Sequence, residues 1–410
     1  MALAPAPVLA PRAMNPANDR AEPELPQVAV LFAHYAPYHV DRVEAAARRL
    51  AGRARVLAVE TADASEAYGW EPARGFALAE HRVLFPGRVY EHIGRLERLT
   101  AYAATLRGAQ LVLSGIPWSD PDIVALAWRR RARGRATIAM TDSKFDDKPR
   151  SLVREQVKAR LLAGFSGAMV AGLRQRDYLR FLGFEERPVL PGYDTLSVER
   201  VRRHAAAAPD LPWAERPFLY VGRMVEKKNL PTLLAGYARY VAEGGGRRLV
   251  LVGEGVQREG LEAQVAAAGL GDRVRFTGHC GARGVAREMA QALALCLVST
   301  EEQWGLVVNE AVAMGIPAIV SPAVGARDAL VRGGVTGHVI EPASPASIAR
   351  AMHAMEADEG RWRAMAEAAA ARHWLADAER FADSAELLFD PASASAAAAV
   401  ARFWDACERD

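Results

Sequence analysis

The chain has 410 residues, more than one hydrophobic core usually supports, so we expect two domains. Hydrophobic residues make up 51% and charged residues 25%, which is typical of a globular protein and excludes a fibrous or wholly disordered chain. The net charge of +3 is divided unevenly, with +6 on residues 1–200 and −3 on residues 201–410, so we expect the two halves to have different partners.

The N-terminal residues and the cysteines indicate the cellular compartment of the protein. Residues 1–26 are rich in Ala and Pro and lack a basic start, so we predict a disordered tail rather than a signal peptide. The three cysteines have no metal-ligand spacing and their number is odd, which favours a reducing cytoplasm. Because no stretch reaches about 18 uncharged apolar residues, we expect any membrane contact to be peripheral.

From Val28 onward, short apolar strands alternate with helices. We predict strands at residues 28–35, 55–60, 111–116, 136–142 and 167–172, and helices at residues 40–50, 96–107, 123–131 and 173–182. This alternation is typical of a parallel sheet. We therefore predict an N-terminal Rossmann-like domain over residues 27–194.

Polar side chains follow several of these strands, at the edge where open α/β sheets bind ligands. The candidates for the acceptor side of a cleft are His34, Tyr35, His39, Asp142 and Ser143. Local capping or packing of each histidine is the alternative.

Basic residues are dense between Arg129 and Arg160. We interpret them as a surface for anionic lipid headgroups or for a phosphate-bearing acceptor. The alternative is a solvated helix face with an i,i+3 pair of Glu155 and Lys158. We expect no nucleic-acid partner, because no aromatic residues or recognition motif accompany the charge.

The second half repeats the β/α pattern. Residues 195–217 are polar, Ala-rich and interrupted by prolines, which predicts a linker. We then predict strands at residues 218–223, 248–255, 274–279, 293–299 and 317–321, with helices between them. This series predicts a second Rossmann-like domain over residues 218–375. Residues 347–371 and 378–388 have the pattern of amphipathic helices.

The stretch STEEQWGLVVNEAVAMGIP, residues 299–317, carries Glu302 and Glu310 on either side of Gly305. A helix begins at Leu306, and its free N–H groups favour a phosphate or sugar oxygen. A carboxylate that accepts two hydroxyl groups is suited to binding a ribose or hexose. The alternative is a capping Glu302 and a solvated Glu310.

Two further features lie at strand ends of this domain. Arg223 and Lys228 supply two cations that would clamp a diphosphate. Gly253 and Gly255 allow close approach of a ligand, but the full G-x-G-x-x-G pattern of dinucleotide-binding proteins is absent, which disfavours a dehydrogenase.

These features occur in one order, together with TGH at residues 277–279. In VGRMVEKKN, LVLVGEG and STEEQWGLVVNEAVAMGIPAIVS the chain resembles the bacterial family-4 retaining glycosyltransferases of the group 1 type. The resemblance covers residues 217–345 closely and the first half loosely. It implies the GT-B fold, in which two Rossmann-like parallel-sheet domains face each other across a cleft. It also implies that residues 376–410 form helices that cross back to the N-terminal domain.

The resemblance implies roles for individual residues. Arg223 and Lys228 would bind the diphosphate, Glu302 would contact the transferred sugar, and these three would carry the catalysis. Glu310 would accept the ribose hydroxyls. The whole expected donor-binding set is Gly222, Arg223, Lys228, Gly253, Gly278, His279, Glu302, Trp304, Gly305, Leu306, Val307 and Glu310.

The resemblance also implies a reaction. We expect a UDP- or GDP-sugar as co-substrate, no metal or other cofactor, and retaining transfer of a hexose to a hydroxyl of a glycan, glycolipid or small molecule. The expected setting is cell-surface polysaccharide or glycolipid synthesis, in the cytoplasm or on the cytoplasmic face of a membrane. Ala36-Pro37 replaces the usual glycine pair, so the acceptor side stays open. The alternatives are a nucleotide-sugar epimerase of this fold and an inactive sugar-nucleotide-binding protein.

Overall fold

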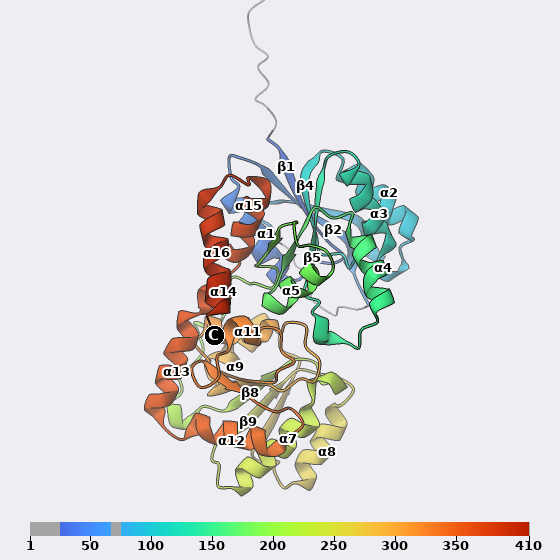
Figure 1. The fold of residues 1–410 in the computed structure, drawn as a ribbon. Coiled ribbons are helices and arrows are strands. Elements are labelled where there is room, and N and C mark those ends of the chain that lie inside the picture. The colour runs from blue at the N-terminus through green and yellow to red at the C-terminus, as the bar shows by residue number, and fades with distance from the viewer. Residues whose placement is uncertain (1–24, 67–74, 410) are drawn as a thin grey trace, which may run out of the picture.

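The computed structural model describes residues 25–66 and 75–409. Of the predicted disordered tail, residues 1–24 lie outside the described residues. The described chain forms two parallel sheets, each flanked by helices and each with its own hydrophobic core (Figure 1). The prediction of two Rossmann-like α/β domains is confirmed.

The first sheet has seven parallel strands in the order β3-β2-β1-β4-β5-β6-β7. Its strands are β1 (Gln27–Phe32), β2 (Arg55–Ala64), β3 (Glu80–Val89), β4 (Ala109–Ser114), β5 (Ala136–Thr141), β6 (Gly167–Val170) and β7 (Val189–Leu190). The helices between them are α1 (Pro37–Arg49), α2 (Arg95–Thr105), α3 (Pro121–Arg131), α4 (Leu152–Leu162) and α5 (Leu173–Phe181). In the central register, Val28 lies opposite Val56 of β2 and Leu111 of β4.

Strand β3 was not predicted from the sequence. It lies at the edge of the sheet, pairs with β2, and none of its side chains is fully buried. Because Pro86 and Gly87 interrupt it, it lacks the apolar run that marks the central strands. Helix α1 begins at Pro37 rather than at the predicted Val40, since proline is favoured at the first helical position.

The second sheet has six parallel strands in the order β10-β9-β8-β11-β12-β13. Its strands are β8 (Phe218–Val221), β9 (Leu249–Val252), β10 (Val274–Gly278), β11 (Ala294–Leu297), β12 (Ala318–Val320) and β13 (Gly337–Val339). The accompanying helices are α7 (Leu230–Ala242), α8 (Arg258–Ala267), α9 (Ala282–Ala290), α10 (Leu306–Ala313) and α11 (Arg327–Leu330).

The remaining helices connect and cover the two sheets. Helix α6 (Val198–Ala205) lies within the segment predicted as a linker. The single helix predicted over residues 347–371 is two helices, α12 (Pro345–Glu356) and α13 (Glu359–Ala371). Asp358 separates them, because its side chain accepts a hydrogen bond from the Arg361 N–H and caps α13.

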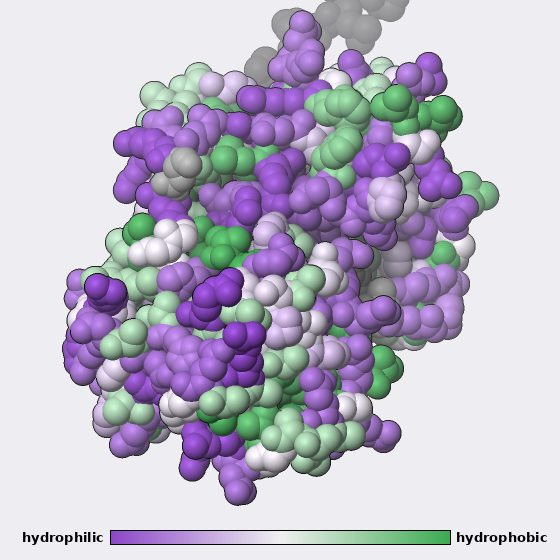
Figure 2. Space-filling model, turned by 60° about the horizontal axis from the view of Figure 1, so that its bottom comes forward, coloured by the Kyte–Doolittle hydropathy of each residue, from purple (hydrophilic) through white to green (hydrophobic). Residues whose placement is uncertain are grey.

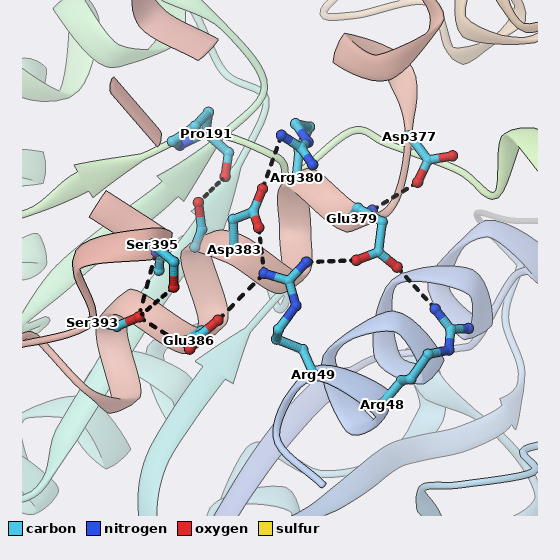
Figure 3. A network of polar contacts seen from close by, with 12 residues as sticks. Arg48, Arg49, Pro191, Asp377, Glu379, Arg380, Asp383, Glu386, Ser393 and Ser395 are labelled. Atoms are coloured by element: carbon cyan, nitrogen blue, oxygen red, sulfur yellow. Dashed lines mark hydrogen bonds and ion pairs between the residues drawn. The ribbon is translucent and has the colours of Figure 1, made fainter. Parts of the chain in front are cut away.

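The last helices are α14 (His373–Ala376), α15 (Glu379–Phe389) and α16 (Ala394–Glu408), and they return to the first sheet. Helix α15 packs against α1, and Arg49 is the centre of their contact (Figure 3). Its guanidinium donates to Glu379, Asp383 and Glu386 at 2.7, 2.5 and 3.3 Å. These ion pairs therefore hold the last helices against the N-terminal domain.

The surface of the molecule is mixed in polarity. On the face drawn in Figure 2, hydrophilic residues dominate and hydrophobic residues form scattered patches. None of the helices in the described ranges has both the length and the apolar character needed to cross a bilayer.

Candidate functional site

A cavity of about 620 Å³ is lined by loops that follow strands of both sheets. Three of the predicted acceptor-side residues line it: His34, His39 and Asp142. The predicted donor-side residues that line it are Gly222, Lys228, Glu302, Trp304, Gly305, Leu306 and Val307. The structure thus brings candidates from the two halves of the chain to one cleft.

The other predicted residues lie outside the lining of this cavity, which does not include Tyr35, Ser143, Arg223, Gly253, Gly278, His279 or Glu310. Arg223 follows β8 and its side chain is exposed. Tyr35 is fully buried in the core, and its hydroxyl donates to the Val30 carbonyl oxygen at 2.8 Å. Tyr35 therefore belongs to the hydrophobic core of the first domain and not to the cavity lining.

Glycines bring the ends of three neighbouring strands close together. The Gly222 N–H donates to the Val252 carbonyl at 3.0 Å, and the Gly253 N–H donates to the Gly278 carbonyl at 2.9 Å. Gly253 has a φ of 129°, and a Cβ there would overlap the Gly222 carbonyl oxygen. This close approach requires glycine. Gly222, which lines the cavity, therefore presents bare backbone beside Lys228.

Lys228 and Glu302 form an ion pair in the part of the cavity lining that the second domain supplies. Their side chains are only 14% and 13% exposed, and the Ser299 hydroxyl also donates to Glu302 at 3.1 Å. Asn229, with a φ of 56°, turns the chain into α7 and donates to the Val298 carbonyl at 3.2 Å. The loop that carries Lys228 is thereby tied to the strand end that leads to Glu302.

Helix α10 begins beside this pair. Gly305 precedes it with a φ of 101°, a left-handed conformation that favours glycine. Leu306 and Val307, the first helical residues, line the cavity. The free N–H groups of this first turn and the positive end of the helix dipole make the wall suited to an anion.

Glu310 lies one turn further along α10, next to Arg200 of α6 and Asp41 of α1. Burial raises the pKa of its carboxyl to about 7, although the charge of Arg200 opposes this shift. Arg200 is held by Asp41, to which it donates at 2.6–3.0 Å. Across residues 25–66 and 75–409, no hydrogen bond from another residue reaches the Glu310 carboxylate, so it remains available to hydroxyl donors.

Asn309, which sequence analysis missed, fixes α10 in place. It is fully buried, its oxygen accepts from Trp304 Nε1 at 2.9 Å, and its amide donates to the Asp194 carbonyl at 2.8 Å. It therefore joins the cavity wall at Trp304 to the segment between the two sheets. The signal in the sequence was an amide in a helix whose other residues, apart from Glu310, are apolar.

On the first-domain side, Glu60 holds His34. The carboxylate lies 2.8 Å from His34 Nδ1 and 3.0 Å from His81 Nε2, and it accepts from the Tyr35 N–H at 2.9 Å. Burial opposes ionisation, but these hydrogen bonds outweigh it and lower the pKa of Glu60 to about 2. An ionised carboxylate thus orients the His34 ring in the cavity wall.

His39 packs face to face on Phe32, with ring centroids 3.9 Å apart. Its Nδ1 accepts from the Ala36 N–H at 3.0 Å, so this nitrogen is the acceptor. Burial, followed by the charge of Arg42, holds the pKa of His39 well below its usual value. The imidazole is therefore neutral at neutral pH.

Asp142 and Asp194 both line the cavity and share a buried environment. Burial raises the pKa of both carboxyls, and for Asp142 the charge of Asp194 raises it further. Arg42, which is fully buried, lies 3.3 Å from Asp194. Because two close carboxylates resist joint ionisation, the pair retains a proton above the usual range for aspartate.

A second cavity of about 280 Å³ opens beside the first, and Asp142 and Gln303 line both. Ser143 lines only this second cavity, together with Lys158 of α4. Lys158 is 5% exposed, and its ammonium donates to the Tyr178 hydroxyl at 2.6 Å. The alternative of a solvated Glu155/Lys158 pair is therefore wrong, since both side chains are buried against Tyr178.

Comparison with known proteins shows to which family and structures the chain is similar. Residues 206–372 match the family model described as "Glycosyl transferases group 1". Alpha-D-kanosaminyltransferase from Streptomyces kanamyceticus is 31% identical over 157 residues, which are 38% of this chain and 40% of that protein. Glycogen synthase from Mycobacterium tuberculosis is 31% identical over 188 residues, 44% and 45% of the two chains. The chain thus spans less than half the length of the curated relatives that it matches.

Similarity to solved structures extends over nearly the whole chain. Sucrose-phosphate synthase from Thermosynechococcus elongatus superposes with a TM-score of 0.69 at 20% identity, over 90% of this chain and 100% of that one. Anabaena HepE, solved with UDP and glucose, gives a TM-score of 0.66 at 17% identity, over 89% and 99%. The chain therefore has the GT-B fold, and over residues 206–372 it is similar to the group 1 glycosyl transferases.

Proposed function

We propose that this protein is a glycosyltransferase that moves a sugar from a nucleoside diphosphate to an acceptor hydroxyl with retention of the anomeric configuration. One observation carries the proposal. A single cleft joins a cation, a carboxylate and a helix N-terminus from the second domain to a proton-holding carboxyl group from the first. The complexes of Anabaena HepE with UDP and glucose, and with UDP-glucose, support a donor of this class.

The donor would lie against the second domain. Its diphosphate would replace Glu302 as the partner of Lys228 and would meet the N–H groups at the start of α10, with exposed Arg223 closing over it. Glu302, once released, would accept hydroxyls of the sugar, and Glu310 would accept those of the ribose. The bare backbone at Gly222 would face the rest of the nucleotide. We assign no metal or other cofactor to the reaction.

Departure of the nucleotide is the step that these groups assist. Charge develops on the leaving diphosphate as the glycosidic bond breaks, and donors already oriented toward it stabilise that charge. Losing one such donor costs about 3–4 kcal/mol of transition-state free energy. An acceptor hydroxyl that enters beside Asp142 would attack the anomeric carbon on the face from which the diphosphate leaves, and its proton would pass to the departing phosphate oxygen, in a cleft that keeps water out.

The biosynthetic role of the protein and its location in the cell are also proposals. The relatives include "D-inositol 3-phosphate glycosyltransferase" from Streptomyces griseus, 30% identical over 231 residues that are 53% of this chain and 43% of that protein. We retain cell-surface polysaccharide or glycolipid synthesis, in the cytoplasm or on the cytoplasmic face of a membrane, as the role to test.

Slow release of UDP or GDP from nucleotide sugars, with water as acceptor, tests the chemistry. We expect Glu302→Gln to lower the rate about ten- to a hundredfold, because an amide accepts sugar hydroxyls less well than a carboxylate. The matched control is Glu301→Gln, whose side chain is 38% exposed and points to Lys227. Proton NMR of the first-formed sugar should show the anomer of the donor.

Three results would contradict the proposal. Equal rates in the Glu302 and Glu301 variants would remove Glu302 from the site. The inverted anomer would refute retention. An epimerised sugar formed from the donor alone would point to the epimerase alternative.

A further inference from the structure

Helix α4 lies on the surface but buries two charged side chains and exposes four apolar ones. Its charged residues Glu155 and Lys158 are buried, at 7% and 5% exposure. The apolar residues Leu152, Val153, Val157 and Leu161 are exposed, at 74%, 71%, 48% and 37%. A surface helix normally presents its apolar stripe to the core and its charges to water. Packing among residues 25–66 and 75–409 therefore does not explain the exposed apolar side of α4.

The inner side of α4 explains the burial of its charges. Lys158 lines the second cavity and donates to the Tyr178 hydroxyl, which in turn donates to Glu155 at 2.6 Å. The Trp118 ring covers the Lys158 ammonium at 4.5 Å. Since this cavity shares Asp142 with the cleft, α4 is the outer wall of a space that leads to the site.

The charges among the exposed apolar residues of α4 have one sign. Arg154 and Arg160 are exposed, Lys148 precedes the helix and is exposed, and Glu155, the only acidic residue in α4, is buried. We call the set Leu152, Val153, Arg154, Val157, Arg160 and Leu161 the α4 face. Apolar side chains beside basic ones are the combination that an anionic bilayer accepts, because acyl chains take the former and headgroups the latter.

The surface continues past the end of α4. Trp128 of α3 is 47% exposed and lies against Gly164, where a Cβ would come within 2.8 Å of its ring. Arg131, also exposed, donates to the Ala163 carbonyl. Tryptophan and arginine are favoured at the boundary between acyl chains and water. The position of Trp128 therefore extends the same chemistry.

We propose that the α4 face docks this protein on an anionic lipid bilayer. Docking would turn the outer wall of the second cavity toward the lipid, so that an acceptor held in the bilayer would approach the cleft from the side of Asp142. The proposal goes beyond the transfer reaction and does not depend on which nucleotide the second domain binds.

Co-sedimentation of the full chain with vesicles tests it. We expect binding to vesicles of equimolar phosphatidylcholine and phosphatidylglycerol, weaker binding as salt is added, and little binding to phosphatidylcholine alone. Leu152→Glu should weaken binding about tenfold, since it removes an inserted side chain and adds a repelled charge. The Arg154→Gln, Arg160→Gln double variant should weaken it about 25-fold, because each basic residue contributes about a factor of five.

Leu96→Glu is the matched control, because Leu96 lies on α2 of the same domain and is 77% exposed. It should bind vesicles as the unaltered chain does. Failure of the unaltered chain to bind anionic vesicles, or equal binding by Leu152→Glu, would overturn the proposal. A dimer in sedimentation velocity that Leu152→Glu dissociates, without vesicle binding, would assign the α4 face to a second copy of the chain instead.

The outcome is separable from the proposed transfer. Calorimetric titration of UDP or GDP into the same variants reports on the donor site alone. Vesicle binding without nucleotide binding would refute the transferase, and nucleotide binding without vesicle binding would refute the docking surface.

Discussion

Asn309 offers a sharp test of how the cavity wall is held. The substitution Asn309→Leu keeps the size of the side chain but removes the buried amide that bridges Trp304 and Asp194. Trp304 Nε1–H loses its acceptor at 2.9 Å, and the Asp194 carbonyl loses its donor at 2.8 Å. Each buried polar group left without a partner costs about 1–3 kcal/mol. The apolar leucine recovers part of this, so we expect a net loss of about 2–4 kcal/mol in the free energy of unfolding.

Urea-induced unfolding followed by tryptophan fluorescence and circular dichroism measures the effect. The Trp304→Phe background supplies the control, because phenylalanine has no N–H to leave unpaired. There we expect Asn309→Leu to cost about 1–3 kcal/mol less. A loss below about 1 kcal/mol in the unaltered background, or an equal loss in both backgrounds, would refute the bridge as the cause.

Three further predictions concern single positions. Because burial raises the pKa of Glu310 to about 7, and only the carboxylate accepts both ribose hydroxyls, nucleotide affinity should fall as the pH is lowered through about 7. Calorimetry of Glu310→Gln should show no such fall, and an unchanged profile would contradict the assignment. Arg49→Ala should lower the free energy of unfolding by about 2 kcal/mol in urea, since three carboxylates on α15 lose a partly buried partner, and no change would contradict the fastening of the last helices. Gly192→Ala should cost about 3 kcal/mol in the same assay, because φ is 96° and the new Cβ would lie 2.5 Å from the Arg380 carbonyl carbon. The control Gly52→Ala, with a φ of 74° and open space around it, should cost only about 1 kcal/mol, and equal losses would contradict the contact.

The alternation of apolar strands and helices was enough to predict five strands of each sheet, because a strand buried on both faces needs a continuous apolar run. The three strands that were missed, β3, β7 and β13, all lie at sheet edges. Strand β3 escaped because it lies at an edge and its residues are partly exposed. Polar residues after strands predicted one edge for the site, and His34, Asp142, Lys228 and Glu302 do share one cavity.

The predictions that were wrong, and the contacts that were not predicted, depend on residues that are far apart in the sequence. The sequence gives no sign that Arg42 lies beside Asp194, or that Tyr178 draws Glu155 and Lys158 inward, because these pairs are set by how helices pack. Glu302 and Glu310 were expected in one donor-binding set, but only Glu302 lines the cavity. A helix rises about 1.5 Å per residue, so Glu310 lies deeper along α10, beyond the cavity lining.

Binding of a nucleoside diphosphate by Lys228 is the interaction on which the proposed function depends most. Calorimetric titration of UDP, GDP and ADP into the unaltered chain and into Lys228→Met tests it directly. We predict that one nucleotide binds and that Lys228→Met weakens its binding about ten- to a hundredfold, because a charge-assisted hydrogen bond contributes about 1.5–3 kcal/mol. Absence of binding by all three, or equal affinity in the variant, would contradict the account.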